Sequence, residues 1–370
     1  MGYFENIKLS SYRNFERLEL DLIKSSNVFF GKNGAGKTNI LESISLFNKG
    51  RGFRNDKIIN LVKKDSENFL NITNYNLKNN SYEIKVSSGV KNNKIFKDTF
   101  LNGDKSPSSK KFINSCFSFI YFLPDMERLF LSNPSFRRNF IDRMIFSYNN
   151  EYNKLINMYK KNIIERTKIL NDNNYDEAWI NNIENNIVTN GLEIYGFRNN
   201  QIEILIDQLG ILKKKQRYPF DINIRLNDES SYNLNKEKYL NILKMNRESD
   251  KFAGGSKIGP HKSDFVFTVD KNYDASQLST GQQKTIVLLI LIAQCNYLIE
   301  NKKITPILLL DEICSHLDET NRYLLLELTQ SFDIQSFMTG TDETLFSFLS
   351  TNTKFYNITN KWQIVTHQNL

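Results

Sequence analysis

Two short segments of the 370-residue sequence carry residues whose types and spacing could do chemistry. The first is Gly31-Lys32-Asn33-Gly34-Ala35-Gly36-Lys37-Thr38, which matches the pattern G-x-x-x-x-G-K-[ST]. Its glycines allow successive backbone N–H groups to turn toward a β-phosphate at a helix N-terminus. We expect Lys37 to reach the β- and γ-phosphates, Thr38 to coordinate Mg²⁺, and the loop with the adjacent Asn39 to bind a nucleotide.

The second segment is a predicted apolar strand, Ile307–Leu310, that ends in Asp311-Glu312. A carboxylate at the end of a buried strand can hold Mg²⁺ beside a γ-phosphate, which is the role that we expect for Asp311. The following Glu312 can polarise an attacking water, so Glu312 and Lys37 are the expected catalytic residues. Because many strands end in acidic residues, this pair alone is weak evidence for an ATPase.

The pattern of elements around both segments predicts an α/β fold. An apolar strand at 27–30 precedes the first segment, and residues 39–48 have helical spacing after it. Residues 69–101 are rich in short β-stretches, and an α/β pattern returns over 276–341. Between these parts, residues 135–213 predict long amphipathic helices with a turn at 171–175. Their expected apolar faces include Leu155, Tyr159, Ile163, Trp179, Ile183 and Ile187.

Composition narrows the class of protein. The apolar fraction of 40% is enough for a large core, and the longest apolar run, Ile286–Ala293, is far shorter than a membrane span. The first residues lack the apolar stretch of a signal peptide, and three widely spaced cysteines form no C-x-x-C pair. We therefore expect a cytoplasmic protein with no membrane partner.

The net charge of +8 lies in the first third of the chain. Residues 1–123 hold 20 Lys and Arg against 11 Asp and Glu. Such a local excess attracts nucleic acid or nucleotide phosphates. A lysine-rich surface without a partner would produce the same excess, so composition leaves both readings open.

The segment Leu278-Ser279-Thr280-Gly281-Gln282-Gln283 resembles the L-S-G-G-Q signature of ABC-type ATPases, with Thr280 in place of the first glycine. The resemblance implies that Ser279, Gly281 and Gln282 bind the ATP held by a second subunit, which would make an ATP-dependent homodimer. Ser315-His316-Leu317-Asp318 resembles the D-loop of the same class and places Asp318 at that shared site.

Four further segments resemble the RecF family of recombination mediators. They are Gly31–Arg54, Phe122–Met126, Pro134–Asp142 and the loop Gly259-Pro260-His261-Lys262-Ser263-Asp264. The resemblance implies an ABC/SMC-type P-loop ATPase head, with lobe I formed by residues 1–123 and 251–370 and an inserted, mainly helical lobe II formed by 124–250.

The same resemblance implies a function in DNA repair and replication and in the SOS response. The protein would bind single-stranded DNA and gap junctions, dimerise with ATP, and help to load recombinase together with RecO and RecR. ATP hydrolysis would be weak and would serve mainly as a release switch. The alternatives left open are the ATPase subunit of an ABC transporter and another SMC-like ATPase.

The resemblance also suggests roles for individual residues. Arg13 and Asn14 would lie near the adenine and phosphates, and Arg51 and Arg54 are candidate DNA contacts or structural pairs. No switch histidine follows the strand at 335–338, so Thr341 or another group would sense the γ-phosphate. Asp125 or Glu127 would take the place of the Q-loop glutamine. We expect His261 to hold its own loop.

Overall fold

The computed structural model describes residues 1–48, 50–91, 94–172, 175–214, 221–228, 234–270, 273–314, 318–330, 332, 334–349, 352–359 and 364–367. The chain forms two compact units, which we call the sheet unit (1–127 and 284–370) and the helical unit (128–283). We expected the second boundary at 250 and 251. Residues 251–283 belong instead to the helical unit, because a strand at 264–269 pairs with one at 222–227.

The sheet unit contains an antiparallel sheet built from the N-terminal third of the chain. Its strand order is β3-β2-β5-β6-β7, and β1 pairs with β5. These strands are β1 (Tyr3–Phe4), β2 (Asn6–Tyr12), β3 (Phe15–Asp21), β5 (Asn68–Leu77), β6 (Asn80–Lys91) and β7 (Lys94–Leu101).

A second sheet of the same unit has the order β15-β14-β4-β13-β12-β8 and is parallel except at its edge strand β15. Every residue of the central β4, β13 and β12 is buried, as parallel strands covered on both faces require. The strands are β4 (Ser26–Phe30), β8 (Phe117–Phe122), β12 (Thr305–Leu310), β13 (Ser336–Gly340), β14 (Thr353–Ile358) and β15 (Ile364–His367).

Helix α1 connects the two sheets of this unit. It contacts β13 of the parallel sheet, and Asn71 of β5 donates a 2.6 Å hydrogen bond to the Ser43 carbonyl of the helix. The helical segments of the unit are α1 (Lys37–Ser45), α2 (Ile58–Leu61), α3 (Pro107–Cys116), η1 (Pro124–Arg128), α9 (Thr280–Tyr297), the π-helical η3 (Leu298–Lys302), α10 (Glu319–Gln330) and η4 (Glu343–Phe346), with α9 and η1 each crossing a unit boundary.

The apolar helix α9, with the following η3, has the length and composition of a membrane span. Of the apolar stretch within Thr280–Lys302, 78% is buried inside the protein, as expected for a helix of the core. A helix buried on all sides has no polar face, so its residues from Thr285 to Cys295 are apolar almost throughout.

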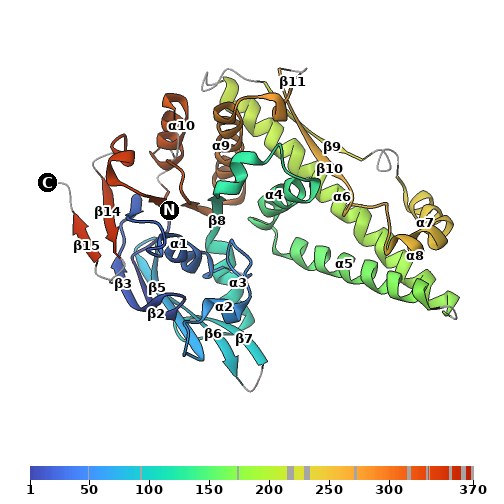
Figure 1. Ribbon diagram of the computed structural model, residues 1–370, viewed down its shortest axis with the longest axis horizontal. Coiled ribbons are helices and arrows are strands. Elements are labelled where there is room, and N and C mark those ends of the chain that lie inside the picture. Colours follow the sequence, from blue (N-terminus) through green and yellow to red (C-terminus); the bar gives the residue numbers. More distant parts are fainter. Residues whose placement is uncertain are drawn as a thin grey trace. The chain divides into compact units, whose positions relative to one another are not determined.

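The helical unit is built around two long helices that lie side by side, α5 and α6 (Figure 1). A small antiparallel sheet, ordered β11-β10-β9, completes it. Its elements are α4 (Pro134–Phe146), α5 (Asn150–Asn171), α6 (Glu177–Lys214), β9 (Ile222–Asn227), α7 (Lys236–Met245), α8 (Arg247–Ala253), β10 (Asp264–Val269), β11 (Tyr273–Asp274) and η2 (Ala275–Gln277).

The core of the helical unit follows the predicted helical periodicity with one exception. Leu155 and Tyr159 of α5 pack with Ile183 and Ile187 of α6 in one cluster. The prediction for Trp179 is wrong, because this side chain is 50% exposed. The buried stripe of α6 runs through Ile180, and a neighbouring residue on a helix lies about 100° away from that stripe.

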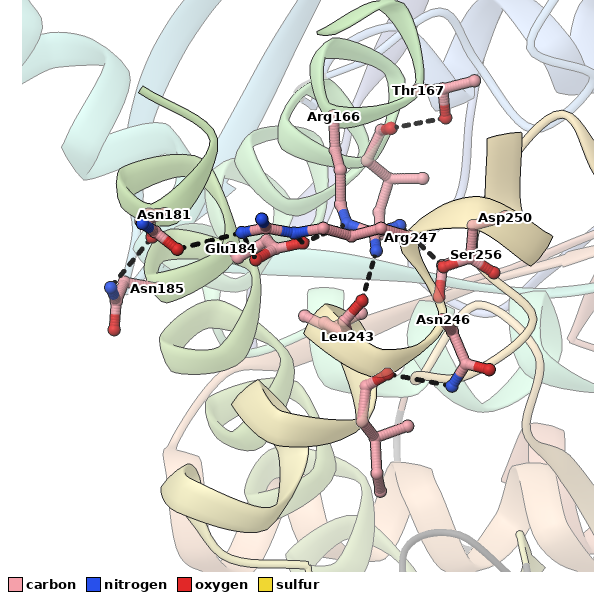
Figure 2. Close-up of polar contacts among 12 residues, drawn as sticks. Arg166, Thr167, Asn181, Glu184, Asn185, Leu243, Asn246, Arg247, Asp250 and Ser256 are labelled. Carbon is pink, nitrogen blue, oxygen red and sulfur yellow. Dashed lines mark hydrogen bonds and ion pairs between the residues drawn. The ribbon is translucent and has the colours of Figure 1, made fainter. Parts of the chain in front are cut away.

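A cluster of buried charges also joins the elements of the helical unit (Figure 2). Arg166 of α5 donates from Nε to Glu184 of α6 at 2.9 Å and from Nη1 to Asp250 of α8 at 2.7 Å. Arg247 forms a second ion pair with Glu184, at 2.7 Å. The cluster therefore fixes three helices with hydrogen bonds that leave no charge in it unpaired.

Candidate nucleotide-binding site

The phosphate loop lies where the sequence predicts it, between β4 and α1. Gly31 and Gly36 have φ angles of +141° and +103°, which residues with a side chain rarely adopt. A Cβ on Gly36 would lie 2.5 Å from Nδ2 of Asn14, and one on Gly31 would lie 2.3 Å from the Ile358 carbonyl oxygen. Both the backbone conformation and the available space therefore require glycine at these two positions.

Lys37 begins α1 and turns its ammonium back toward the loop. Its Nζ donates to the carbonyl oxygens of Gly31 at 2.7 Å and Lys32 at 3.0 Å, and the residue is only 5% exposed. Burial lowers the pKa of this ammonium, while the charges of Glu312 and Asp311 act in the opposite direction. The geometry thus holds a buried cation at the mouth of a loop of backbone N–H groups.

Asp311 receives two hydroxyl hydrogen bonds at the edge of the parallel sheet. Oγ1 of Thr38 donates to its Oδ1 at 3.0 Å, and Oγ1 of Thr339 donates to the same atom at 2.7 Å. Thr38 follows β4, Asp311 follows β12, and Thr339 lies on β13, the strand between them. Because carboxyl ends of parallel strands share one edge of a sheet, the topology brings together residues from three distant parts of the sequence.

Glu312 occupies an unusual backbone conformation next to this cluster. Its φ angle is +49°, and its N–H donates to Oγ1 of Thr339 at 2.8 Å. The side chain is exposed, in contrast to its buried neighbours Asp311 and Ile313. Left-handed backbone at a bulky residue is strained and is found mainly at functional sites, where the surrounding structure maintains it.

Thr339 is a site residue that the sequence did not identify. Its hydroxyl donates to Asp311 and accepts from the Glu312 backbone, so it orients both acidic residues. Thr341, which we expected to sense the γ-phosphate, is exposed and lies just after the strand. No local pattern marked Thr339, because all five residues of β13 are buried and its place beside Asp311 depends on the order of the strands in the sheet.

Asn14 contacts the phosphate loop and is itself bound by Asn39 of α1, whereas Arg13 binds carboxylates. Nδ2 of Asn14 donates to the Ala35 carbonyl oxygen at 3.5 Å, and Nδ2 of Asn39 donates to Oδ1 of Asn14 at 2.7 Å. The guanidinium of Arg13 donates to both carboxylate oxygens of Glu42, at 2.5 and 2.8 Å. Glu42 is a fully buried residue of α1 that sequence reasoning overlooked.

Arg13 has a second carboxylate partner, since its Nη2 lies 3.0 Å from Oδ2 of Asp56. Burial lowers the pKa of the Arg13 guanidinium, but hydrogen bonding to Glu42 and its charge outweigh that effect and raise the pKa overall. The structure therefore places this arginine in an ion-pair cluster beside the loop, with its charge directed at Glu42.

The two arginines expected to contact DNA differ in their surroundings. Arg51 is exposed and makes no ion pair or hydrogen bond within the described part of the chain. Nη1 of Arg54 donates to Oδ1 of Asn39 at 2.9 Å and lies 3.7 Å from a carboxylate oxygen of Glu42. Arg54 is therefore a partner of the residues around the loop, while Arg51 projects into solvent.

The signature segment forms an exposed helix N-terminus in the helical unit. Oγ of Ser279 accepts from the Gln282 backbone at 3.3 Å, and Oε1 of Gln282 accepts from the Ser279 backbone at 3.0 Å. This reciprocal pair is a capping box at the start of α9. Gly281 lies within the first turn, and the Ser279 and Gln282 side chains are exposed, so this surface is open to another molecule.

Asp318 likewise caps a helix. Its Oδ1 accepts from the Asn321 backbone N–H at 2.8 Å, at the start of α10. The other three residues of the predicted D-loop, 315–317, lie outside the described residues.

Glu127 and Asp125, the two candidates for the Q-loop position, have different surroundings in the structure. Oε1 of Glu127 accepts from Nζ of Lys284 at 2.7 Å, and the Lys284 ammonium lies 5.4 Å from the centre of the Phe122 ring. Asp125 is exposed. Of these two residues, Glu127 is therefore the one that a buried partner, Lys284, holds in position.

The residues at this edge of the parallel sheet fit a magnesium ion. Mg²⁺ prefers oxygen ligands and commonly takes one or two from the protein, the others coming from phosphates and water. The Thr38 hydroxyl and the Asp311 carboxylate provide two such oxygens. Within the described ranges, no group of three or more His, Cys, Asp or Glu side chains is placed to hold a metal ion.

Comparison with known proteins places the chain in a family. Residues 3–364 match the family model described as the RecF/RecN/SMC N terminal domain. The chain is 34% identical to the DNA replication and repair protein RecF of Rickettsia akari over 346 residues, covering 92% of this chain and 94% of that protein. It is also 34% identical to RecF of Rickettsia prowazekii over 361 residues, with the same coverage.

The chain belongs to the RecF family. Its function is accordingly that of a recombination mediator in DNA replication and repair, as the sequence predicts. The alternative of a transporter ATPase subunit is set aside by this membership.

The structure of this RecF-family chain agrees with that assignment. It resembles the structure described as the recombination mediator protein RecF-ATPrS in the RecFOR pathway, with a TM-score of 0.85, 25% identity and coverage of 99% of this chain and 98% of the other. A Smc head domain bound to the C-terminal domain of ScpA, from Pyrococcus furiosus, shares the fold with a TM-score of 0.55 at 15% identity. The predicted fold class is therefore confirmed.

Proposed function

We propose that this RecF-family protein binds ATP and Mg²⁺ at its phosphate loop and uses them to control its hold on DNA. Residues 31–39 with Asn14 would hold the phosphates, and Thr38 and Asp311 would supply two oxygens to Mg²⁺. The observation that carries this proposal is the Asp311 carboxylate, which accepts hydroxyl hydrogen bonds from Thr38 and Thr339 beside the loop. The RecF-ATPrS and RecF-ATP structures that the chain resembles support the choice of nucleotide.

ATP bound to one copy would be completed by the signature segment of a second copy. Ser279, Gly281 and Gln282 would reach the γ-phosphate of the partner, with Asp318 beside them. The exposed capping box at the start of α9 supports this arrangement, because a helix N-terminus attracts phosphate and the side chains there are open to solvent. Burial of two nucleotides between two copies would then make the dimer depend on ATP.

DNA would bind the dimer at single-strand gaps and junctions, in the cytoplasm. The positive charge of residues 1–123 and the exposed Arg51 support an attraction to phosphates, whereas Arg54 would act through Asn39 and Glu42. The relative's description as part of the RecFOR pathway supports RecO and RecR as partners. Slow hydrolysis, with Glu312 polarising water and Lys37 stabilising the transferring phosphate, would release the protein.

Sizing by light scattering tests the shared site. With ATP and Mg²⁺ we expect a dimer for the wild-type protein and a monomer for Ser279→Arg, because arginine would fill the space for the partner's phosphate. Ser279→Thr is the matched control, since it keeps the capping hydroxyl and should retain the dimer. A Ser279→Arg protein that dimerises like the wild type would refute the shared site.

Binding to gapped DNA tests the role of the nucleotide. We expect ATP with Mg²⁺ to increase DNA affinity, and Lys37→Ala to abolish that increase while leaving the fold intact. Glu312→Gln should prolong the ATP-bound dimer, because it removes the group that polarises water but keeps the binding contacts. An increase that persists in Lys37→Ala would contradict the proposal.

A further inference from the structure

A cavity of about 280 Å³ lies within the helical unit, and none of the residues that line it is assigned above to the nucleotide. Helices α4, α5 and α6 and the loop at 260–261 line it. Its volume is just below the range typical of small-molecule sites and is ample for a phosphate group with an attached sugar. Ser135, Asn139 and Lys160 are exposed, so the cavity is open to solvent on the side of α4 and α5.

The charged groups that line the cavity are mainly cationic. They are Arg138, Lys160 and Arg198, with Asp142 as the carboxylate. Asp142 accepts from Nε and Nη2 of Arg198, both at 2.9 Å, in a buried bidentate pair. This pair is neutral, so the lining keeps the positive charges of Arg138 and Lys160.

His261 also lines the cavity but adds no charge. The Tyr159 hydroxyl lies 2.8 Å from its Nδ1, and its Nε2 lies 2.9 Å from the Ser256 carbonyl oxygen. Because a carbonyl oxygen only accepts, Nε2 carries the proton and Nδ1 accepts from the tyrosine. Burial lowers the pKa of the ring and favours its neutral form. Both nitrogens hold the loop, as the sequence predicts for His261.

Two adjacent arginines beside the cavity differ in how many of their N–H donors the protein uses. Arg137 donates from Nε and Nη2 to the two carboxylate oxygens of Asp264, at 2.8 and 2.7 Å. Arg138 donates only from Nη1, to the Ser263 carbonyl oxygen at 2.6 Å, among the described residues. A guanidinium has five N–H donors. Arg138 therefore has N–H donors left for a further acceptor, whereas Nε and Nη2 of Arg137 already donate to Asp264.

Lys160 completes the arrangement from α5. It is exposed, and the described structure gives its ammonium no hydrogen bond or ion pair. A half-buried guanidinium and an ammonium on the same cavity, with a planar fork among the donors, match the charge and the oxygen geometry of a phosphate group. Burial and the nearby Arg198 lower the pKa of Arg138, and the charges of Asp264 and Asp142 act in the opposite direction without cancelling that effect.

We propose that this cavity binds a phosphate group of a nucleic acid strand, with Arg138 and Lys160 as the contacting cations. The inference deepens the proposed function, because it names a second DNA contact in the helical unit, which is separate from the charge of residues 1–123. The strand is preferred over a free phosphate because the volume exceeds that of one phosphate and the site is open to solvent. Contacts of this kind fix position on the strand and read no base sequence.

The test measures binding of a labelled single-stranded oligonucleotide by fluorescence anisotropy, with and without ATP. Lys160→Gln should weaken binding about threefold and reduce the salt dependence by about one phosphate contact, which is a slope of about 0.7 for single strands. Lys161→Gln is the matched control, because Lys161 is exposed on the same helix, lines no part of the cavity and carries the same charge. We expect that variant to bind like the wild type.

Arg138→Gln should have the larger effect, about tenfold, since it removes a charge-assisted hydrogen bond. Circular dichroism checks its fold, and the exposed Lys160 keeps the test valid if Arg138→Gln misfolds. The inference is wrong if Lys160→Gln binds DNA as tightly as Lys161→Gln does. If ATP increases DNA affinity in that case, the proposed function stands alone; if ATP has no effect but Lys160→Gln still weakens binding, only the proposed function fails.

Inorganic phosphate distinguishes the source of the phosphate group. Titration calorimetry is done in a Lys37→Ala background, so that the phosphate loop does not contribute. If Lys160→Gln weakens phosphate binding but leaves oligonucleotide binding unchanged, the cavity takes a free phosphate and the proposal of a nucleic acid strand is wrong. Weakening of oligonucleotide binding, specific to the cavity variants, supports it.

Discussion

Each unit of this RecF-family protein contains an arginine–carboxylate cluster, and the two clusters differ in their exposure to solvent. In the helical unit, Arg166, Glu184 and Asp250 are at most 2% exposed, and only Arg247, at the edge of the cluster, reaches 13% (Figure 2). In the sheet unit, Arg13 is 16% exposed and Asp56 29%, while only Glu42 is fully buried. Arginine–carboxylate ion pairs are therefore almost fully shielded from water in the helical unit and partly hydrated in the sheet unit.

The difference bears on what each cluster can do. Charges taken fully out of water must keep all their partners, because an unpaired buried charge is very unfavourable. The cluster of the helical unit can only hold α5, α6 and α8 in one arrangement. The cluster of the sheet unit touches α1 directly after the phosphate loop, and its half-hydrated members can exchange a carboxylate for water at modest cost. We therefore expect a rearrangement linked to the nucleotide in the Arg13 cluster rather than in the Arg166 cluster.

Arg166→Met should have the largest effect. It leaves the carboxylates of Glu184 and Asp250 buried without Arg166, at a cost of about 4 kcal/mol of unfolding free energy. The measurement is urea denaturation followed by circular dichroism at 222 nm. Lys168→Met on the same helix is the control, because Lys168 is exposed and its loss should leave the midpoint nearly unchanged. Equal midpoints for the two variants would mean that the buried cluster is not a rigid clamp.

Arg13→Gln should have a smaller effect, about 2 kcal/mol, although it also removes the main partner of a fully buried carboxylate. Glu42 keeps the Tyr12 hydroxyl at 3.0 Å and Arg54 at 3.7 Å, and solvent reaches the remainder of the cluster. The same denaturation experiment measures it, and nucleotide affinity is measured in parallel. A loss as large as that of Arg166→Met would remove the distinction between the dry and the hydrated cluster.

Thr339→Val should lower the unfolding free energy by only about 1 kcal/mol, since it deletes one hydroxyl that donates to Asp311 and accepts from the Glu312 backbone. Its functional effect should be clearer, because both acidic residues lose their orientation. ATP hydrolysis by Thr339→Val should fall well below that of Thr339→Ser, which keeps the hydroxyl. Equal rates for the valine and serine variants would show that the hydroxyl does not orient the site.

The sequence predicted those parts of the site that lie in contiguous motifs. The phosphate loop, the strand before Asp311 and the helix after Ser279 could be identified because glycine spacing and apolar runs are local signals. Thr339 and Glu42 could not, since their roles arise only when β13 lies between β4 and β12 and when α1 lies against Arg13. The second unit boundary was displaced for a similar reason, because pairing between β9 and β10 joins segments that are distant in the sequence.

Lys97 extends the comparison to a partly buried cation that has no carboxylate partner among the described residues, and its effect should be the smallest. Its Nζ donates to the carbonyl oxygens of Asn48 at 3.1 Å and Gly50 at 2.7 Å, and burial lowers its pKa to about 8. The unfolded chain keeps this amine protonated well above pH 8, so it binds more protons than the folded chain as the pH rises past 8, and stability rises with pH.

The expected gain from Lys97 between pH 7 and pH 8 is about 0.4 kcal/mol, because half of the amine is neutral at pH 8 in the folded protein. Urea midpoints of the wild type and Lys97→Met at both pH values isolate this contribution, since other titrating groups cancel in the difference. The wild type should gain on the variant as the pH rises. A constant difference would show that the two carbonyl groups stabilise the ammonium as well as water does, and burial without a carboxylate would then carry no penalty in the sheet unit.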